Sequence, residues 1–123
     1  ASRTGWREEV AVRIHGDVGV AEELVLSVVG RVLENRRAEL AILERDVSKL
    51  EAVQAPFPRI SYDQAVEVLK KKGSEIQWGG DFGGTDETLV AEDYDRPLMV
   101  DRYPTAIKAF YMKPDPGEPD KAL

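Results

Sequence analysis

The feature that most constrains the fold is a regular spacing of apolar residues between residues 20 and 45. Apolar side chains recur there at steps of three and four, and charged side chains fall mostly between them. The apolar positions are Ala21, Leu24, Val25, Val28, Val29, Val32, Leu33, Leu40 and Leu43. This spacing predicts one long amphipathic helix over residues 20–45. A helix that faces a core is the plainer interpretation, and a helix that binds a partner is the alternative.

A second helix is predicted over residues 61–72, because both of its ends carry recognisable signals. Ser61 is a suitable N-cap, and Gln64 completes a capping box three positions later. Gly73 supplies a left-handed residue past the last turn. The lysines at 70–72 suit the negative end of the helix dipole, so they have a structural explanation. Contact with nucleic acid is the alternative role for this lysine cluster.

A glycine-rich loop follows the second helix. Its four glycines, within residues 79–84, surround Asp81 and Phe82, and Thr85 is a suitable cap for a short acidic helix through about Tyr94. Glycine-rich loops before helices can bind phosphate, but this spacing does not match a P-loop and the helix begins with acidic residues. We therefore expect a flexible connecting loop.

Two short segments near the carboxyl end predict strands. Leu98–Arg102 alternates in polarity, and Ala109–Met112 is apolar and aromatic. The linker between them is turn-like, so we expect an antiparallel hairpin within residues 95–116, followed by an irregular polar tail. A further strand is possible at Glu9–Ile14. Three helices and a C-terminal β-hairpin indicate the α+β class, with a sheet too small to stand comfortably alone.

Composition narrows the classes of function. The 123 residues suit one domain, and 17 Lys and Arg against 23 Asp and Glu give a net charge of −6, which does not favour nonspecific binding of DNA. The chain has neither an apolar run long enough for a membrane span nor a signal peptide, so we expect a cytoplasmic protein. With no cysteine and the single His15, thiolate sites are excluded and His-based metal or triad sites are hard to build.

Four segments together resemble one protein family. They read VAEELVLSVVGRVLENRRAEL, FPRISYDQAVEVL, WGGDFGGTDETLV and RPLMVDRYPTAIKAFYMKPDP. They are similar to the catalytic domain of bacterial asparaginyl-tRNA synthetase, a class II aminoacyl-tRNA synthetase, and the string YPTAIKAFYM is the most specific match. The resemblance implies that residues 1–123 are a partial catalytic domain, with a shortened remnant of motif 2 at residues 1–14. It also places the hairpin in the antiparallel sheet, flanked by helices, that floors the aminoacyl-adenylate pocket.

The resemblance implies the activity of an asparagine-tRNA ligase. Such enzymes join asparagine to ATP as asparaginyl-adenylate and transfer the asparaginyl group to tRNA-Asn, with Mg²⁺ as a cofactor, and they are expected to be homodimers. Motif 3 and the family's magnesium-binding acidic residues have no counterpart in this sequence. We therefore expect no catalytic residue, metal ligand or cofactor site in this segment alone, and we expect it to be inactive. A non-catalytic scaffold or binding derivative, and the asparagine synthetase paralogue, are the alternatives.

Substrate-binding residues are also implied by the resemblance. Glu8, or Glu9 if the gap in motif 2 lies differently, would read the side-chain amide of asparagine. Lys108 would orient an acidic group near the asparagine or the adenylate. Tyr103 and Tyr111 would lie on the same hairpin, beside Lys108.

These hairpin residues also have plainer interpretations. Lys108 could form an ion pair with Asp101 or Asp115 instead of contacting a substrate. The aromatic rings of Tyr103 and Tyr111 could belong to the core, with their hydroxyl groups bonded to the protein.

Overall fold

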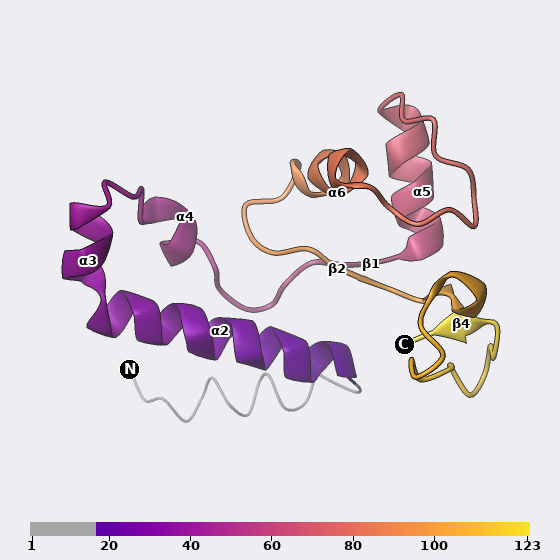
Figure 1. Ribbon diagram of the computed structural model, residues 1–123, viewed down its shortest axis with the longest axis horizontal. Helices are drawn as coiled ribbons and strands as arrows, with labels where there is room; N and C mark the ends of the chain where they lie inside the picture. The colour runs from indigo at the N-terminus through magenta and orange to yellow at the C-terminus, as the bar shows by residue number, and fades with distance from the viewer. Residues whose placement is uncertain (1–16) are drawn as a thin grey trace. The chain divides into compact units, whose positions relative to one another are not determined.

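The computed structural model describes residues 17–123. The chain divides into two compact units, one that ends at Phe57 and one from Pro58 to Leu123, although the length suggested a single domain. The elements, drawn in Figure 1, are α2 (Asp17–Asn35), α3 (Arg37–Ile42), α4 (Ser48–Glu51), β1 (Arg59–Ser61), α5 (Tyr62–Lys71), α6 (Gly84–Ala91), β2 (Met99–Asp101), β3 (Tyr103–Pro104), the 3₁₀ turn η1 (Thr105–Ile107) and β4 (Lys121–Ala122). The motif 2 remnant at residues 1–14 and the possible strand at Glu9–Ile14 lie outside the described residues.

The helix predicted over residues 20–45 is two helices. α2 ends at Asn35 and α3 begins at Arg37, because Arg36 has φ −130° and ψ 21° and so leaves the helical region. The prediction of one continuous helix was wrong. Apolar spacing continues across a single non-helical residue, so periodicity does not reveal the break.

α3 ends in a Schellman motif built on a glutamate. Glu44 has φ 50°, the N–H of Arg45 donates to the carbonyl of Leu40 (3.0 Å), and the N–H of Glu44 donates to the carbonyl of Ala41 (3.1 Å). Glycine is the usual residue at this position, because a side chain makes the left-handed conformation unfavourable. The residue type therefore offers no signal that the helix ends here.

Polar contacts join the elements of the first unit. The guanidinium of Arg37 in α3 lies 2.9 Å from the carboxylate of Glu51 in α4. The buried carboxylate of Glu22 in α2 accepts the N–H of Phe57 at 3.1 Å, which ties the end of the unit back to its first helix. α2 nevertheless leaves three apolar side chains more than half exposed: Val20, Leu24 and Val28.

The capping signals of α5 are confirmed. Ser61 Oγ accepts the N–H of Gln64 at 3.2 Å, and Gln64 Oε1 accepts the N–H of Ser61 at 2.9 Å. Past the last turn, Gly73 has φ 85° and the N–H of Ser74 donates to the carbonyl of Leu69 at 3.0 Å. Both ends of this helix are therefore determined by residues close in sequence, which explains why the pattern predicts them well.

The core of the second unit lies between α5 and α6. Ala65 and Leu69 on α5 are fully buried, and Val90 on α6 is 3% exposed. The partly buried apolar side chains around them are Ile60, Val68, Ile76, Phe82, Leu89, Leu98 and Val100. The core thus draws on β1, β2 and the glycine-rich loop as well as on both helices.

α6 differs at both ends from the predicted acidic helix. Gly83, not Thr85, is the N-cap, and Asp86 accepts its N–H at 3.1 Å. The helix ends at Ala91 and does not reach Tyr94. An acidic side chain in the first turn satisfies a free N–H as well as a capping threonine does, so Thr85 was a misleading signal.

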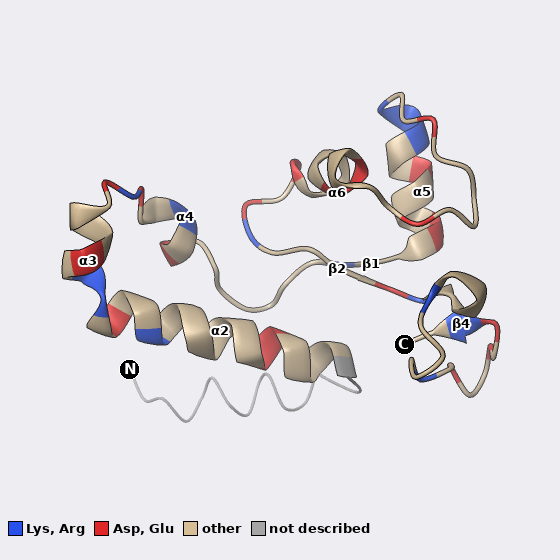
Figure 2. Ribbon diagram, in the orientation of Figure 1, with Lys and Arg blue, Asp and Glu red and all other residues tan. Residues whose placement is uncertain are grey.

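Lys72, in the lysine cluster, has a structural role at the end of α6, which differs from the role predicted at the end of its own helix. Its ammonium donates to the carbonyl of Leu89 (2.8 Å) and pairs with Glu92 (2.9 Å) and Asp93 (2.6 Å), so it caps the end of α6. These carboxylates, Asp93 first, raise the pKa of Lys72. Figure 2 shows the basic residues gathered at the end of α5.

The predicted antiparallel hairpin within residues 95–116 is not formed. β2 falls inside the predicted strand Leu98–Arg102, but it pairs in parallel with β1, with Ile60 opposite Val100. Residues 109–112 form a turn in which the N–H of Met112 donates to the carbonyl of Ala109 at 2.9 Å. β3 instead pairs antiparallel with β4, in the tail that was expected to be irregular.

Arg102 explains why the chain leaves β2 and enters a different sheet. It has φ 57°, which bends the chain sharply between β2 and β3. Its guanidinium lies 2.9 Å from Asp115 and 2.7 Å from Glu118, in the segment before β4. These ion pairs hold β3 beside β4 and offset the unfavourable left-handed backbone.

Two substitutions at Arg102 should separate the backbone strain from the ion pairs. We expect Arg102→Ala to destabilise the second unit by about 1 kcal/mol more than Arg102→Gly, because both lose the ion pairs and only glycine relieves the left-handed strain. Urea unfolding of both variants of the natural polypeptide that contains this chain measures which of the two is the more stable. Equal stability of the two variants would contradict the assigned conformation.

Candidate functional site

Aromatic rings from three parts of the second unit meet around the start of α5. Tyr62 stacks on Phe82, with ring centroids 5.2 Å apart and planes at 13°. Tyr103 lies 5.2 Å from Tyr62 and 5.6 Å from Phe82, and Trp78 meets Tyr62 edge-on at 6.3 Å. We call these four residues the aromatic cluster. It brings together α5, the glycine-rich loop and β3.

Lys108 lies over one ring of the aromatic cluster. Its Nζ is 4.0 Å from the ring centroid of Tyr103, a cation–π distance, and it donates to Asp81 Oδ1 at 3.0 Å. The Lys108 side chain is only 24% exposed. An ion pair was one interpretation of this lysine, but the partner is Asp81 and not Asp101 or Asp115.

Tyr103 is held in its protonated form. Burial, followed by the negative charges of Asp81 and Glu87, raises the pKa of Tyr103 to about 12. Its phenol is protonated at neutral pH and can donate a hydrogen bond, and its ring lies beneath a lysine cation. The pair offers a donor and a positive charge to an anionic or carbonyl group.

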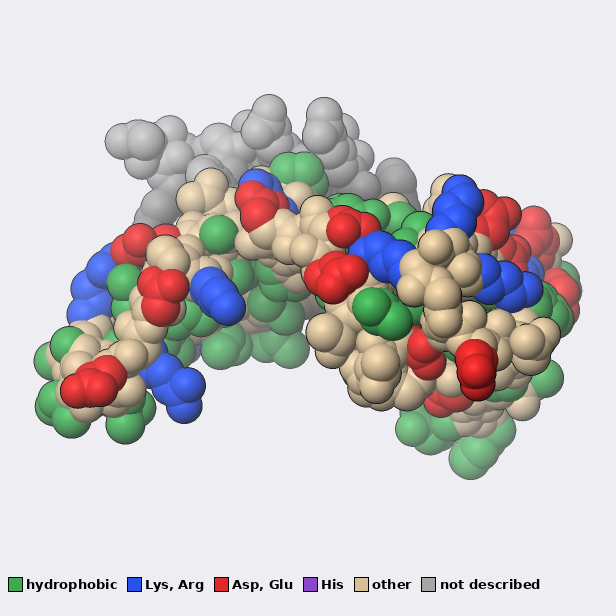
Figure 3. Space-filling view, turned by 90° about the horizontal axis from the view of Figure 1, so that it is seen from above, with side chains coloured by type: hydrophobic (Ala, Val, Ile, Leu, Met, Phe, Trp, Pro, Cys, Tyr) green, Lys and Arg blue, Asp and Glu red, His purple; other side chains and the backbone are tan. Residues whose placement is uncertain are grey.

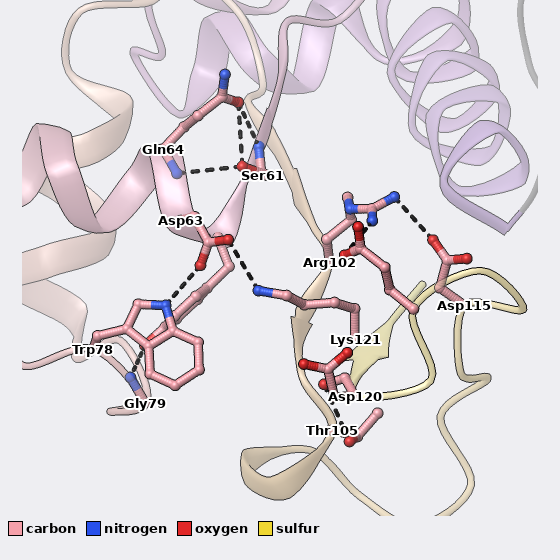
Figure 4. Close-up of polar contacts among 12 residues, drawn as sticks. Ser61, Asp63, Gln64, Trp78, Gly79, Arg102, Thr105, Asp115, Asp120 and Lys121 are labelled. Atoms are coloured by element: carbon pink, nitrogen blue, oxygen red, sulfur yellow. Dashed lines mark hydrogen bonds and ion pairs between the residues drawn. The ribbon is translucent and has the colours of Figure 1, made fainter.

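A second lysine reaches the other side of the aromatic cluster. Asp63 Oδ1 accepts the indole N–H of Trp78 at 2.6 Å, and Asp63 Oδ2 pairs with the ammonium of Lys121 at 2.9 Å, as Figure 4 shows. The Lys121 ammonium also lies 5.3 Å from the Trp78 ring centroid. These contacts join the first turn of α5, the glycine-rich loop and β4.

Acidification should weaken this junction. The Trp78 indole, then Lys121, hold the pKa of Asp63 below its ordinary value of 3.8. When folding lowers the pKa of a carboxyl group, that group stabilises the folded state at pH values above its unfolded-state pKa. This stabilisation is lost as the pH falls through the folded-state pKa. We expect the unfolding free energy of the natural polypeptide to fall below about pH 4, and Asp63→Asn to reduce this dependence.

The matched control is Glu67→Gln, which neutralises an exposed carboxylate on the same helix. The urea unfolding midpoint of Glu67→Gln, measured from neutral to acidic pH, should change with pH in the same way as that of the unmodified protein. Identical pH dependence for Asp63→Asn and the unmodified protein would contradict the role given to Asp63.

The predicted substrate-binding residues fall into three groups. Tyr103 and Lys108 lie together in the aromatic cluster and its adjoining ion pair. Tyr111 does not join them: it is 75% exposed and meets Phe110 edge-on at 5.6 Å. Glu8 and Glu9 lie outside the described residues.

Several residues of this site were not predicted from the sequence. Asp81 was seen only as part of a flexible loop. Tyr62 was hidden inside a capping box, and Lys121 lay in a tail that was expected to be irregular. No local pattern connects these residues to Lys108, since they are brought together only by the fold.

Other kinds of site find no support within residues 17–123. No three His, Asp or Glu side chains in this part gather closely enough to hold a metal ion. None of the described helices has the length and apolar character needed to cross a membrane. On the face shown in Figure 3, acidic and basic side chains are interspersed.

Comparison with known proteins places this architecture in a family. The family model described as tRNA synthetases class II (D, K and N) matches residues 14–123. Asparagine-tRNA ligase of Desulforamulus reducens is 58% identical over 97 residues, covering 79% of this chain and 23% of the relative. Asparagine-tRNA ligase of Sorangium cellulosum is 52% identical over 120 residues, covering 88% of this chain and 27% of the relative.

A solved structure gives the same result. The crystal structure of asparaginyl-tRNA synthetase from Pyrococcus horikoshii complexed with asparaginyl-adenylate has a TM-score of 0.78 and 46% identity, over 86% of this chain and 24% of that one. The chain thus spans about a quarter of the length of the relatives it matches. On the sequence match over residues 14–123 and the shared fold, this chain belongs to the class II tRNA synthetase family (D, K and N).

Proposed function

We propose that this chain is part of the catalytic domain of an asparagine-tRNA ligase. The main support is its likeness to the Pyrococcus horikoshii enzyme complexed with asparaginyl-adenylate, at 46% identity and a TM-score of 0.78. The ligase would form asparaginyl-adenylate from asparagine and ATP and transfer the asparaginyl group to tRNA-Asn. A homodimer, a cytoplasmic location and a requirement for Mg²⁺ complete the proposal.

Lys108 and Tyr103 are the residues of the described part that we propose for substrate binding. An ammonium has three N–H donors, and Asp81 accepts one of them, which leaves donors for an anionic group of the substrate. The protonated Tyr103 phenol lies in the same cluster. Recognition of the asparagine amide by Glu8 or Glu9 stays a prediction. The substrate-binding role of Tyr111 also stays a prediction.

The chemistry available to these residues is positioning and charge stabilisation. When the asparagine carboxylate attacks the α-phosphate of ATP, the bond to the β-phosphate breaks and pyrophosphate leaves, and negative charge is concentrated around the α-phosphate. A fixed cation, whose orientation is set before the substrate arrives, stabilises that charge without reorganising during the reaction. Lys108 is suited to this role because Asp81 and the Tyr103 ring hold its ammonium.

The test is asparagine-dependent exchange of pyrophosphate into ATP by the natural polypeptide that contains this chain. Exchange with asparagine but not with aspartate is the expected result. Exchange that requires aspartate, or formation of asparagine from aspartate, would instead indicate an aspartate enzyme or the amide-forming paralogue. No exchange with any amino acid would favour a non-catalytic scaffold. Residues 1–123 alone are expected to show no exchange.

A further inference from the structure

The hydroxyl of Tyr62 connects a buried ring to the backbone of the glycine-rich loop. It donates to the carbonyl of Gly80 at 2.6 Å and accepts the N–H of Gly79 at 2.9 Å. Tyr62 is the first residue of α5 and is fully buried. Its hydroxyl therefore ties backbone groups of two consecutive loop residues, Gly79 and Gly80, to the start of α5.

The loop contains a tight turn that depends on a glycine. Gly79 has φ 90°, and the N–H of Gly80 donates to the carbonyl of Gln77 at 3.0 Å, which closes a tight turn. Left-handed glycines have many alternative conformations, so a turn built on one is easily displaced. The Tyr62 hydroxyl holds the last two residues of this turn through the N–H of Gly79 and the carbonyl of Gly80.

Asp81 lies between two points that Tyr62 holds. Gly80, before it, is bonded to the Tyr62 hydroxyl, and Phe82, after it, stacks on the Tyr62 ring. The Asp81 carboxylate itself is exposed and meets the Lys108 ammonium at 3.0 Å. The backbone position of Asp81, and with it the direction of the ion pair, is thus set by a side chain that does not touch Lys108.

We propose that the Tyr62 hydroxyl is a positioning group for Lys108. It anchors the loop Trp78–Phe82 so that Asp81 holds the Lys108 ammonium over the Tyr103 ring. This role rests on the proposed function, in which Lys108 orients an acidic group of the asparagine or the adenylate. Phenylalanine would fill the same space in the core, so the role belongs to the hydroxyl and not to the ring.

Tyr62→Phe in the natural polypeptide tests the proposal, because it removes only the hydroxyl. We expect amide hydrogen exchange in the peptide that spans residues 77–82 to speed up about tenfold, because two hydrogen bonds to the loop backbone are lost. We also expect kcat/KM for asparagine in pyrophosphate exchange to fall about tenfold, because a displaced Lys108 ammonium stabilises the transition state less.

Two further variants distinguish positioning from general loss of structure. Tyr94→Phe removes a phenol hydroxyl from a partly buried tyrosine of the same unit, outside the cluster, and should alter neither measurement. Asp81→Asn should lower kcat/KM for asparagine as Tyr62→Phe does, while leaving hydrogen exchange at Gly79 near normal. The double variant Tyr62→Phe, Asp81→Asn should have a kcat/KM no lower than the worse single variant, since both act on Lys108 through one route.

If amide hydrogen exchange in residues 77–82 of Tyr62→Phe matched that of the unmodified polypeptide, the anchoring role of Tyr62 would be overturned. Faster hydrogen exchange with an unchanged kcat/KM, or effects on kcat/KM that multiply in the double variant, would overturn the link to Lys108. Failure of the proposed function has a different signature, because the unmodified polypeptide would then show no asparagine-dependent exchange of pyrophosphate. In that case hydrogen exchange alone decides whether Tyr62 positions the loop.

Discussion

Replacement of Lys108 by methionine in the natural polypeptide is expected to lower asparagine-dependent pyrophosphate exchange about 100-fold. Methionine keeps much of the unbranched side chain beside Tyr103 but removes the charge and the N–H donors. Losing one preorganised donor to a developing negative charge typically costs a factor of about 100 to 1,000 in rate. The Asp81 carboxylate is exposed, so losing its partner should alter stability little.

Lys113→Met is the matched control for this effect. Lys113 lies five residues further along the chain and its side chain is exposed. Lys113→Met should retain near-normal pyrophosphate exchange, and its circular dichroism spectrum should match that of Lys108→Met. A Lys108→Met variant with activity within about threefold of the unmodified enzyme would contradict the substrate-binding role proposed for this lysine.

Leu69→Ala is expected to cause the largest loss of stability. Leu69 is fully buried between α5 and α6, and it belongs to the small group of buried residues that form the core of the second unit. Truncation of a buried leucine to alanine typically costs about 2–5 kcal/mol, through lost apolar burial and the cavity left behind. A small core has few other contacts to share this loss, so we expect about 3 kcal/mol or more.

Hydrogen exchange of the α5 backbone in the natural polypeptide measures this loss in the second unit itself. Leu43→Ala is the control, because the same atoms are removed from a side chain that is 66% exposed, and its effect should stay within about 0.5 kcal/mol. If the α5 amides of Leu69→Ala were as well protected from hydrogen exchange as those of the unmodified protein, the assignment of Leu69 to the core of the second unit would be contradicted.

The elements that the sequence predicts best are those specified by neighbouring residues. The capping box joins Ser61 to Gln64, three positions apart, and Gly73 closes the same helix. Such signals act over one turn of helix, so they can be read from the order of residues alone.

The strand pairings could not be predicted in this way. β1 pairs with β2 across about 40 residues, and Ile60 lies opposite Val100. The local alternation at residues 98–102 indicates a strand, but it does not indicate the partner or the direction of pairing. The expected partner, Ala109–Met112, was chosen because it is near in sequence, and the left-handed Arg102 directs the chain elsewhere.

The candidate site was predictable in part. Lys108 and Tyr103 were identified through the family resemblance, and the structure brings them within cation–π distance of each other. The carboxylate that holds Lys108 lies 27 residues earlier, in a loop whose glycines suggested only flexibility. A long-range ion pair leaves no pattern in one sequence, which is why Asp101 and Asp115 were considered and Asp81 was not.

Transfer of labelled asparagine to tRNA-Asn by the natural polypeptide is the most direct test of the proposed ligase. With ATP present, we expect asparagine to become attached to tRNA-Asn, aspartate not to be attached, and Lys108→Met to slow the attachment of asparagine. Asparagine activation without attachment to tRNA, or attachment of aspartate in its place, would contradict it.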